Sequence, residues 1–188
     1  MWRHGYAAIS VNRIIEEAGV LNGSFYHFFP SKLDLLLAMF DHLWTMQRRQ
    51  LARIYDTQAS PEETLRRHMA WLCDAQIAGK REQGFVPGLF HMSAGITMVE
   101  DHPAIAAKIR GTNDEHMAFL VDIMNRITPG GAAVARYHAR ALASFATGAI
   151  FLARIYDSLE WVETIPPFVE NTIAELRAGT AAPGISRQ

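Results

Sequence analysis

The chain has 188 residues, of which 49% are hydrophobic and 20% charged, so it can bury a sizeable core and is not a disordered chain. Its net charge of −1 excludes an overall polycation, so any contact with nucleic acid must come from a local patch. The single cysteine, Cys73, cannot form an internal disulfide, which favours a reducing compartment. No apolar run approaches the roughly 20 residues of a membrane span and the first residues are not a signal peptide. We therefore expect a soluble, cytoplasmic protein.

Helical periodicity fills almost every long segment and strand alternation is scarce, which predicts an all-α fold. Three of the expected helices follow a capping serine: Ser10, Ser31 (with Asp34 three residues later) and Ser60 (with a proline next). In chain order, the predicted helices cover residues 11–18, 22–29, 32–54, 61–79, 84–99 (broken by proline and glycine), 103–127, 132–158 and 168–177.

The first two predicted helices form a helix-turn-helix pattern. Gly19 supplies the tight turn, and Val20 and Phe25 are expected to pack inward. The second helix is then expected to present outward Asn22, Gly23, Ser24, Tyr26 and His27. Such a set suits a DNA major groove, because Asn reads an adenine edge, Ser and Tyr reach phosphates or bases, and Gly permits close approach. The alternative is an ordinary helical corner with half-buried aromatic rings.

The segment from Gly5 to Phe40, GYAAISVNRIIEEAGVLNGSFYHFFPSKLDLLLAMF, resembles the DNA-binding segment of the TetR/AcrR family of bacterial transcriptional regulators. The matching positions are Gly5-Tyr6, Ser10-Val11, Ile14, Ala18-Gly19-Val20, Gly23-Ser24-Phe25-Tyr26, Phe28, Ser31-Lys32 and Leu35-Leu36. The resemblance implies DNA-binding roles for Ser10, Val11, Asn22, Gly23, Ser24, Tyr26, His27 and Lys32.

Two positions depart from the pattern of the family. Only Met1 to His4 precede Gly5, whereas the family has a whole helix there, so we expect a DNA-binding domain that is truncated at its start, with either a true start upstream or a looser DNA-binding region. Leu21 stands where the family usually has a capping Ser or Thr, a loss of about 1 kcal/mol. Asn22 is an alternative cap if the helix starts one residue later.

The resemblance also implies the organisation of the chain. Residues 1–40 are expected to be the helix-turn-helix DNA-binding domain, 41–178 a ligand-binding and dimerisation domain, and 179–188 a flexible tail. The implied partners are double-stranded operator DNA, a small apolar or aromatic effector and a second copy of the chain. The implied function is that of a ligand-responsive regulator, a repressor, released from its operator by the effector.

Aromatic, methionine and polar residues on the expected helices around the pocket of the family form the candidate ligand site. These residues are Trp71, Phe85, Phe90, His91, Met117, Phe119, Phe145 and Arg154. For each apolar residue among them, ordinary core packing is the alternative. Arg154 either binds an anionic group of the effector or forms an ion pair with Asp157 or Glu160.

The eight histidines do not form a metal-binding pattern, because no HExxH occurs and no two histidines are three or four residues apart. A glycine-rich phosphate loop and a nucleophile elbow are also missing from the sequence. We therefore expect no cofactor, no metal and no enzymatic activity. Two other classes stay open: a dimeric small-molecule binder that has lost DNA binding, and an all-helical enzyme.

Overall fold

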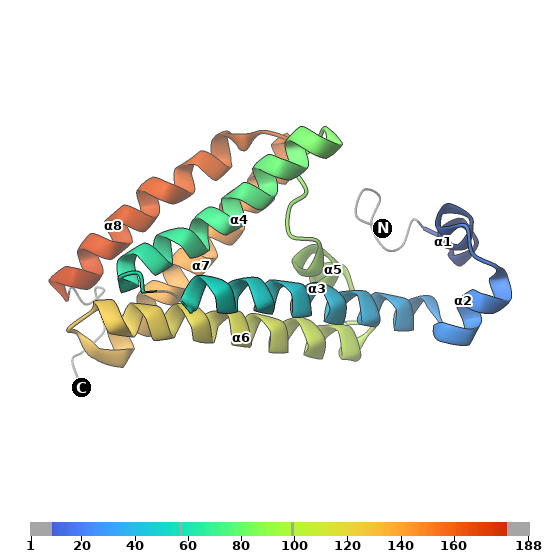
Figure 1. The fold of residues 1–188 in the computed structure, drawn as a ribbon, viewed down its shortest axis with the longest axis horizontal. Coiled ribbons are helices and arrows are strands. Elements are labelled where there is room, and N and C mark those ends of the chain that lie inside the picture. Colours follow the sequence, from blue (N-terminus) through green and yellow to red (C-terminus); the bar gives the residue numbers. More distant parts are fainter. Residues whose placement is uncertain (1–8, 57, 99, 180–188) are drawn as a thin grey trace. The chain divides into compact units, whose positions relative to one another are not determined.

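The computed structural model describes residues 9–56, 58–98 and 100–179, and within these ranges it contains helices and no β-strand (Figure 1). The elements are α1 (Val11–Ala18), α2 (Asn22–Phe28), α3 (Lys32–Tyr55), α4 (Pro61–Gln83), α5 (Phe90–Met98), α6 (Pro103–Ile127), α7 (Gly131–Tyr156), the 3₁₀ helix η1 (Leu159–Thr164) and α8 (Ile165–Ala178). The all-α prediction is confirmed. The flexible tail expected at 179–188 lies, from residue 180 onward, outside the described residues.

The three serine caps are present where the sequence predicts them. Ser10 Oγ accepts the backbone N–H of Arg13, and Ser60 Oγ accepts that of Glu63, each at 3.2 Å. Ser31 Oγ accepts the N–H of Asp34 at 3.2 Å and donates its own proton to the Asp34 carboxylate at 2.7 Å. Each cap satisfies a backbone donor that the first turn of a helix leaves without a partner.

Three helix boundaries differ from the prediction. The broken helix expected over residues 84–99 begins only at Phe90. The helix expected to stop near Gly79 continues to Gln83 and ends at Gly84, whose φ of +79° is left-handed and whose N–H donates to the Lys80 carbonyl. The last α-helix begins at Ile165, three residues early, because its two prolines occupy the first turn, where a missing N–H is not needed.

By density of contacts, the described chain divides into two compact units. Unit 1 comprises residues 1–49 and 90–112, and unit 2 comprises residues 50–89 and 113–188. The functional boundary expected at residue 40 stays a prediction. The core of unit 1 is small and is built from α3, α5 and α6 by Leu36, Phe40, Phe90, Met98 and Ile105.

Unit 2 has the larger core, in which α8 packs on α4 and α7 (Figure 1). Its fully buried side chains include Leu65, Leu120, Leu142, Ile150 and Leu176. The alanines of α7, among them Ala139 and Ala146, are buried in this core, so they pack within the subunit.

Side chains from α4 and α7 hold the segment between α4 and α5. The Asp157 carboxylate accepts the N–H of Val86 at 2.8 Å and the Lys80 ammonium at 2.6 Å. The Gln76 side-chain carbonyl accepts the N–H of Gly88 at 2.8 Å, and the Arg154 guanidinium donates to the Val86 carbonyl at 3.1 Å. These contacts satisfy backbone groups that no regular element pairs.

A hydrogen-bonded chain of three side chains lies in unit 2. The Tyr55 hydroxyl is 2.8 Å from Nδ1 of His68, and Nε2 of His68 is 2.7 Å from Nε2 of His116. Burial and the neighbouring His116 hold the pKa of His68 well below its usual value. Burial, with a smaller contribution from Asp122, raises the pKa of Tyr55. Both groups are therefore neutral near pH 7.

Gly79→Ala tests the packing of α4 against the segment that follows it. A Cβ at Gly79 would lie 2.0 Å from Cγ of Pro87, a rigid ring atom, so we expect a loss of about 1 to 3 kcal/mol in the free energy of unfolding. At Gly111, a helical position with no atom within 4 Å of the added Cβ, alanine is expected to add up to about 1 kcal/mol. Thermal and urea unfolding measure both variants, and equal stability of the two would contradict the packing.

The buried His68 predicts that stability falls on acidification. The unfolded chain protonates this histidine near its usual pKa of about 6.5, whereas the folded chain resists the proton. Its contribution is therefore complete above pH 6.5 and is lost as pH falls toward the depressed folded pKa, with a slope of at most about 1.4 kcal/mol per pH unit.

Urea unfolding of the wild type and of His68→Gln between pH 7.5 and 5.5 checks this prediction. We expect a shallower decline in the variant, and an unchanged decline in a control that replaces the exposed His27 with Gln. Parallel curves for the wild type and His68→Gln would show that the acid sensitivity has another source.

Candidate functional site

The turn between α1 and α2 is a glycine-centred helix stop. Gly19 has φ +64° and its N–H donates to the carbonyl of Glu16, while the N–H of Val20 donates to that of Ile15. This pair of bonds is a Schellman motif, and a residue with a Cβ is strained at the left-handed position. Gly19 therefore sets the direction in which the chain leaves α1 and enters α2.

The second helix, α2, turns one aromatic ring inward and leaves the others outside. The Phe25 side chain is only 6% exposed, whereas Tyr26 is 48% and Phe28 71% exposed. Val20, expected to pack inward, is also exposed. An exposed aromatic cluster on a short helix has no role in the core and is available for contact with a partner.

The helix α2 begins without a side-chain cap. Leu21 is the residue at the N-cap position, its side chain is 78% exposed, and it makes no capping hydrogen bond. Asn22 lies in the first turn and does not replace the cap, so the alternative start is not adopted and the Asn22 side chain stays exposed.

All eight residues predicted to bind DNA belong to unit 1. Asn22, Gly23, Ser24, Tyr26 and His27 are exposed on α2, and Ser10 and Val11 lie at the start of α1. Lys32 begins α3, is half-buried, and has its pKa lowered by burial. The predicted DNA-binding residues thus occupy three neighbouring helix starts or faces in one compact unit.

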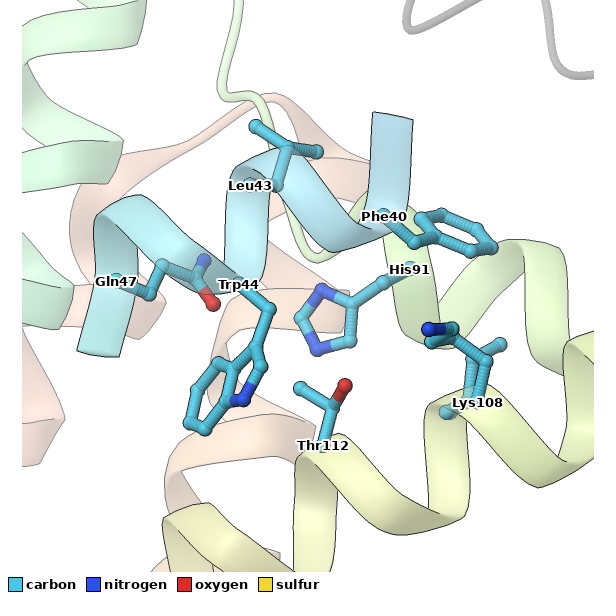
Figure 2. Close-up of a pocket in the computed structure, with 8 residues that line it drawn as sticks. Phe40, Leu43, Trp44, Gln47, His91, Lys108 and Thr112 are labelled. Atoms are coloured by element: carbon cyan, nitrogen blue, oxygen red, sulfur yellow. The ribbon is translucent and has the colours of Figure 1, made fainter. Parts of the chain in front are cut away.

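A pocket opens in unit 1 and is lined by residues of α3, α5 and α6 (Figure 2). Its empty space is about 360 Å³, including open solvent. The lining residues are Phe40, Leu43, Trp44, Gln47, His91, Lys108, Ile109 and Thr112. Only His91 among them was predicted from the sequence as a ligand contact. Trp44 and Leu43 have the helical spacing of core residues, and no local signal in the sequence distinguishes a pocket wall from a core.

The other predicted ligand residues lie elsewhere. Phe90 is buried in the core of unit 1, where its ring is 6.0 Å from that of Phe40. The remaining six, Trp71, Phe85, Met117, Phe119, Phe145 and Arg154, belong to unit 2. The structure therefore does not bring the eight together around one described cavity, and their ligand-binding role stays a prediction.

Within unit 2, two of these residues have ring contacts with the hydrogen-bonded pair of Tyr55 and the buried His68. The Phe119 ring is 5.0 Å from that of Tyr55, and the Trp71 ring is 6.2 Å from His68. Met117 is half-buried against the core. Phe145 stacks on Phe168 with a ring separation of 3.9 Å.

Arg154 has a structural role in addition to any contact with a ligand. Its guanidinium lies 4.7 Å from the centre of the Phe85 ring and donates to the Val86 carbonyl. The carboxylate of Asp157, one of its two expected partners, pairs with Lys80 instead. Arg154 therefore secures the segment that includes Phe85 and Val86.

In the part of the chain that the structure describes, no group of three or more His, Cys, Asp or Glu residues is placed to hold a metal ion. Among the same residues, no helix has both the length and the apolar character needed to cross a membrane.

Known proteins similar to this chain are regulators. The family model described as bacterial regulatory proteins, tetR family, matches residues 1–39. A curated relative from Lactococcus lactis subsp. lactis, an uncharacterized HTH-type transcriptional regulator in the lacX 3′ region, is 32% identical over 73 residues. That match spans 38% of this chain and 37% of the relative.

Solved structures extend the similarity in fold to nearly the whole chain. A TetR-family transcriptional regulator from Streptomyces coelicolor has a TM-score of 0.82 at 20% identity, with 94% of this chain and 89% of that chain covered. A TetR-family regulator from Agrobacterium tumefaciens has a TM-score of 0.77 at 20% identity, with 90% of each chain covered. The match of residues 1–39 shows that the N-terminal segment is similar to bacterial regulatory proteins of the tetR family, and the solved structures show that the chain shares the fold of TetR-family regulators.

Proposed function

We propose that this protein is a transcriptional regulator of the TetR type and a ligand-responsive repressor, which binds operator DNA as a homodimer through α1 and α2 and releases it when a small apolar or aromatic effector binds. The observation that carries the proposal is the exposure of Asn22, Gly23, Ser24, Tyr26 and His27 on the second helix of a helix-turn-helix. Exposed aromatic surface is unfavourable in water, so its placement on this helix is best explained by a partner.

The side chains that α2 exposes match the chemistry of a major groove. The amide of Asn22 can donate to and accept from an adenine edge, and the hydroxyls of Ser24 and Tyr26 can reach phosphates or bases. An added Cβ at Gly23 meets no protein atom within 4 Å, so a duplex can approach the backbone there. Lys32, at the start of α3, adds a charge and a helix N-terminus that favour a phosphate.

The outer face of α7 supports a homodimer. Arg140, Ser144 and Gly148 are exposed at intervals of four residues and therefore lie along one side of this helix. Ser144 and Gly148 are small, so a second helix can approach closely, and a two-fold axis there would pair α7 and α8 with their copies in a four-helix bundle. A two-fold axis would place the two copies of α2, the proposed reading helices, opposite the two half-sites of an operator, which are about 34 Å apart.

The helix α3 supplies the route from effector to DNA in this proposal. It begins at Lys32, beside α2, and its residues up to Arg49 belong to the unit that also contains α1 and α2. An effector that binds better to a displaced α3 shifts the dimer population toward a spacing of the reading helices that no longer fits the operator.

Tyr26→Ala tests the reading helix. Because Tyr26 is exposed and not part of the core, we expect its loss to weaken operator binding about tenfold or more while the fold and the oligomeric state are unchanged. The measurement is fluorescence anisotropy with the duplex directly upstream of the protein's own gene, in competition with an unrelated duplex, at about 50 and 200 mM salt.

The matched control is Tyr156→Ala, which removes another exposed tyrosine at the end of α7. Normal operator affinity of Tyr26→Ala would remove Tyr26 from the interface. A folded wild-type dimer with no preference for the upstream duplex, but with ligand-dependent stabilisation, would favour a small-molecule binder without DNA function over the regulator.

Gly148→Glu tests the dimer face. A side chain at Gly148 meets no atom of its own subunit within 4 Å, so the fold is expected to accept glutamate, while a close helix pair across a two-fold axis cannot. We expect the mass in solution, measured by size-exclusion chromatography with light scattering, to fall from dimer to monomer. Gly111→Glu, also at an open helical position, is the control, and an unchanged dimer in Gly148→Glu would place the interface on another face.

A further inference from the structure

Leu21 occupies the start of α2 with its backbone but not with its side chain. Its backbone is extended, with φ −77° and ψ 148°, and its carbonyl accepts the N–H of Phe25 at 3.1 Å. Polar residues such as serine are favoured at this position, because a side-chain oxygen accepts an N–H of the first turn. The Leu21 side chain makes no capping hydrogen bond, so it does not stabilise the start of the helix.

The Leu21 side chain does not belong to the core either. Its exposed fraction of 78% is the largest among the large hydrophobic side chains of the described residues. Val20, directly before it, and Phe28, at the end of α2, are also exposed. A single exposed leucine on a surface is ordinary, but here exposed apolar side chains gather at both ends of one short helix. Such a concentration indicates contact with a partner.

The place of Leu21 in the helix-turn-helix puts it beside bases in the proposed complex with DNA. In such motifs the second helix lies in the major groove, and the residues at its start contact base edges. Leu21 directly precedes Asn22, whose amide suits an adenine edge. Their Cα atoms are about 3.8 Å apart, close to the roughly 3.4 Å between successive base pairs. Leu21 therefore reaches the base pair that Asn22 reads or the next one.

The major groove offers one group that suits an aliphatic side chain. Phosphates are charged and most of each base edge consists of hydrogen-bond donors and acceptors, so contact with leucine would remove their water without replacing its hydrogen bonds. The exception is the 5-methyl group of thymine, which is apolar and projects into the groove. Burial of one methyl group is worth about fourfold in affinity.

We propose that Leu21 is a specificity-determining residue, which reads the 5-methyl group of a thymine in each half-site of the operator. The assignment rests on the proposed function and adds Leu21 to the eight residues predicted from the sequence to bind DNA. Leu21 and Asn22 together select A·T base pairs, Asn22 by the adenine edge and Leu21 by the methyl group. Two half-sites bring the contribution of Leu21 to about 15-fold in affinity.

Deoxyuridine in place of thymidine tests the methyl contact, because uracil lacks only the 5-methyl group and keeps the same base pairing. The operator is the duplex that the wild-type protein selects from a random-sequence pool, prepared once with thymidine and once with deoxyuridine throughout. Fluorescence anisotropy with the full-length protein measures the Kd of each duplex at one salt concentration. We expect the wild type to bind the deoxyuridine duplex about tenfold or more weakly. Equal binding of the two duplexes would overturn the proposal.

Leu21→Ala assigns the methyl contact to this residue, because loss of every thymine methyl group also affects other contacts and the shape of the duplex. We expect this variant to bind the thymidine duplex about tenfold more weakly, and to lose less than about threefold more with deoxyuridine. Met46→Ala, at another exposed apolar position of unit 1, is the control and is expected to keep the full dependence on the methyl groups. An equal loss in the wild type and in Leu21→Ala would assign the methyl contacts to other residues and overturn the proposal.

Leu21→Ser separates the contact with DNA from the stability of α2. Serine at this position supplies the missing cap, so we expect a higher Tm than that of the wild type. The ratio of its affinities for the thymidine and deoxyuridine duplexes is nevertheless expected to fall to that of Leu21→Ala. A stabilised variant that retains the wild-type ratio would show that Leu21 does not read the methyl group.

The result of the selection distinguishes this proposal from the proposed function. A folded protein that selects no duplex from the pool would contradict the proposed function, and the role of Leu21 with it. A protein that selects an operator but binds it equally well without methyl groups would contradict only the role of Leu21.

Discussion

The capped start of α3 is the constraint on which the rest of unit 1 depends. Ser31 and Asp34 fix the first turn of this helix by two hydrogen bonds, and the register set there determines where every later side chain points. From that register Leu36 and Phe40 enter the core, while Trp44 lines the pocket. A shift of one residue would rotate these side chains by about 100° and remove both the core and the pocket wall.

Neutral buried polar groups are a second common feature of the molecule. His68 is hydrogen-bonded at both ring nitrogens, and burial lowers its pKa and that of His91. The side-chain carbonyl of Gln76, also buried, accepts the N–H of Gly88. Neutral side chains satisfy buried backbone and side-chain partners without the cost of a buried charge. Charged side chains pair at more exposed positions instead. In the ion pair of Arg66 with Glu170, the two side chains are 39% and 54% exposed.

Much of the fold is predictable from the sequence because its signals are local. Helical periodicity, the serine caps and the left-handed Gly19 act over three to five residues, so the elements and the helix-turn-helix follow from short stretches of chain. The end of α4 is not predictable in this way. Gly79 has the composition of a helix stop, but it is retained within the helix, where the absence of a side chain lets Pro87 pack against it.

The sequence by itself determined the all-α class, the helix-turn-helix and the set of exposed residues on α2, because the pattern that specifies them is contiguous. Only the tertiary structure decided that Asn22 does not take over the missing cap of α2 and that Trp44, His91 and Thr112 share one pocket. These three residues are far apart in the chain and come from three helices. Whether such a side chain fills a core or lines a cavity depends on the packing of helices distant in sequence, which no local pattern records.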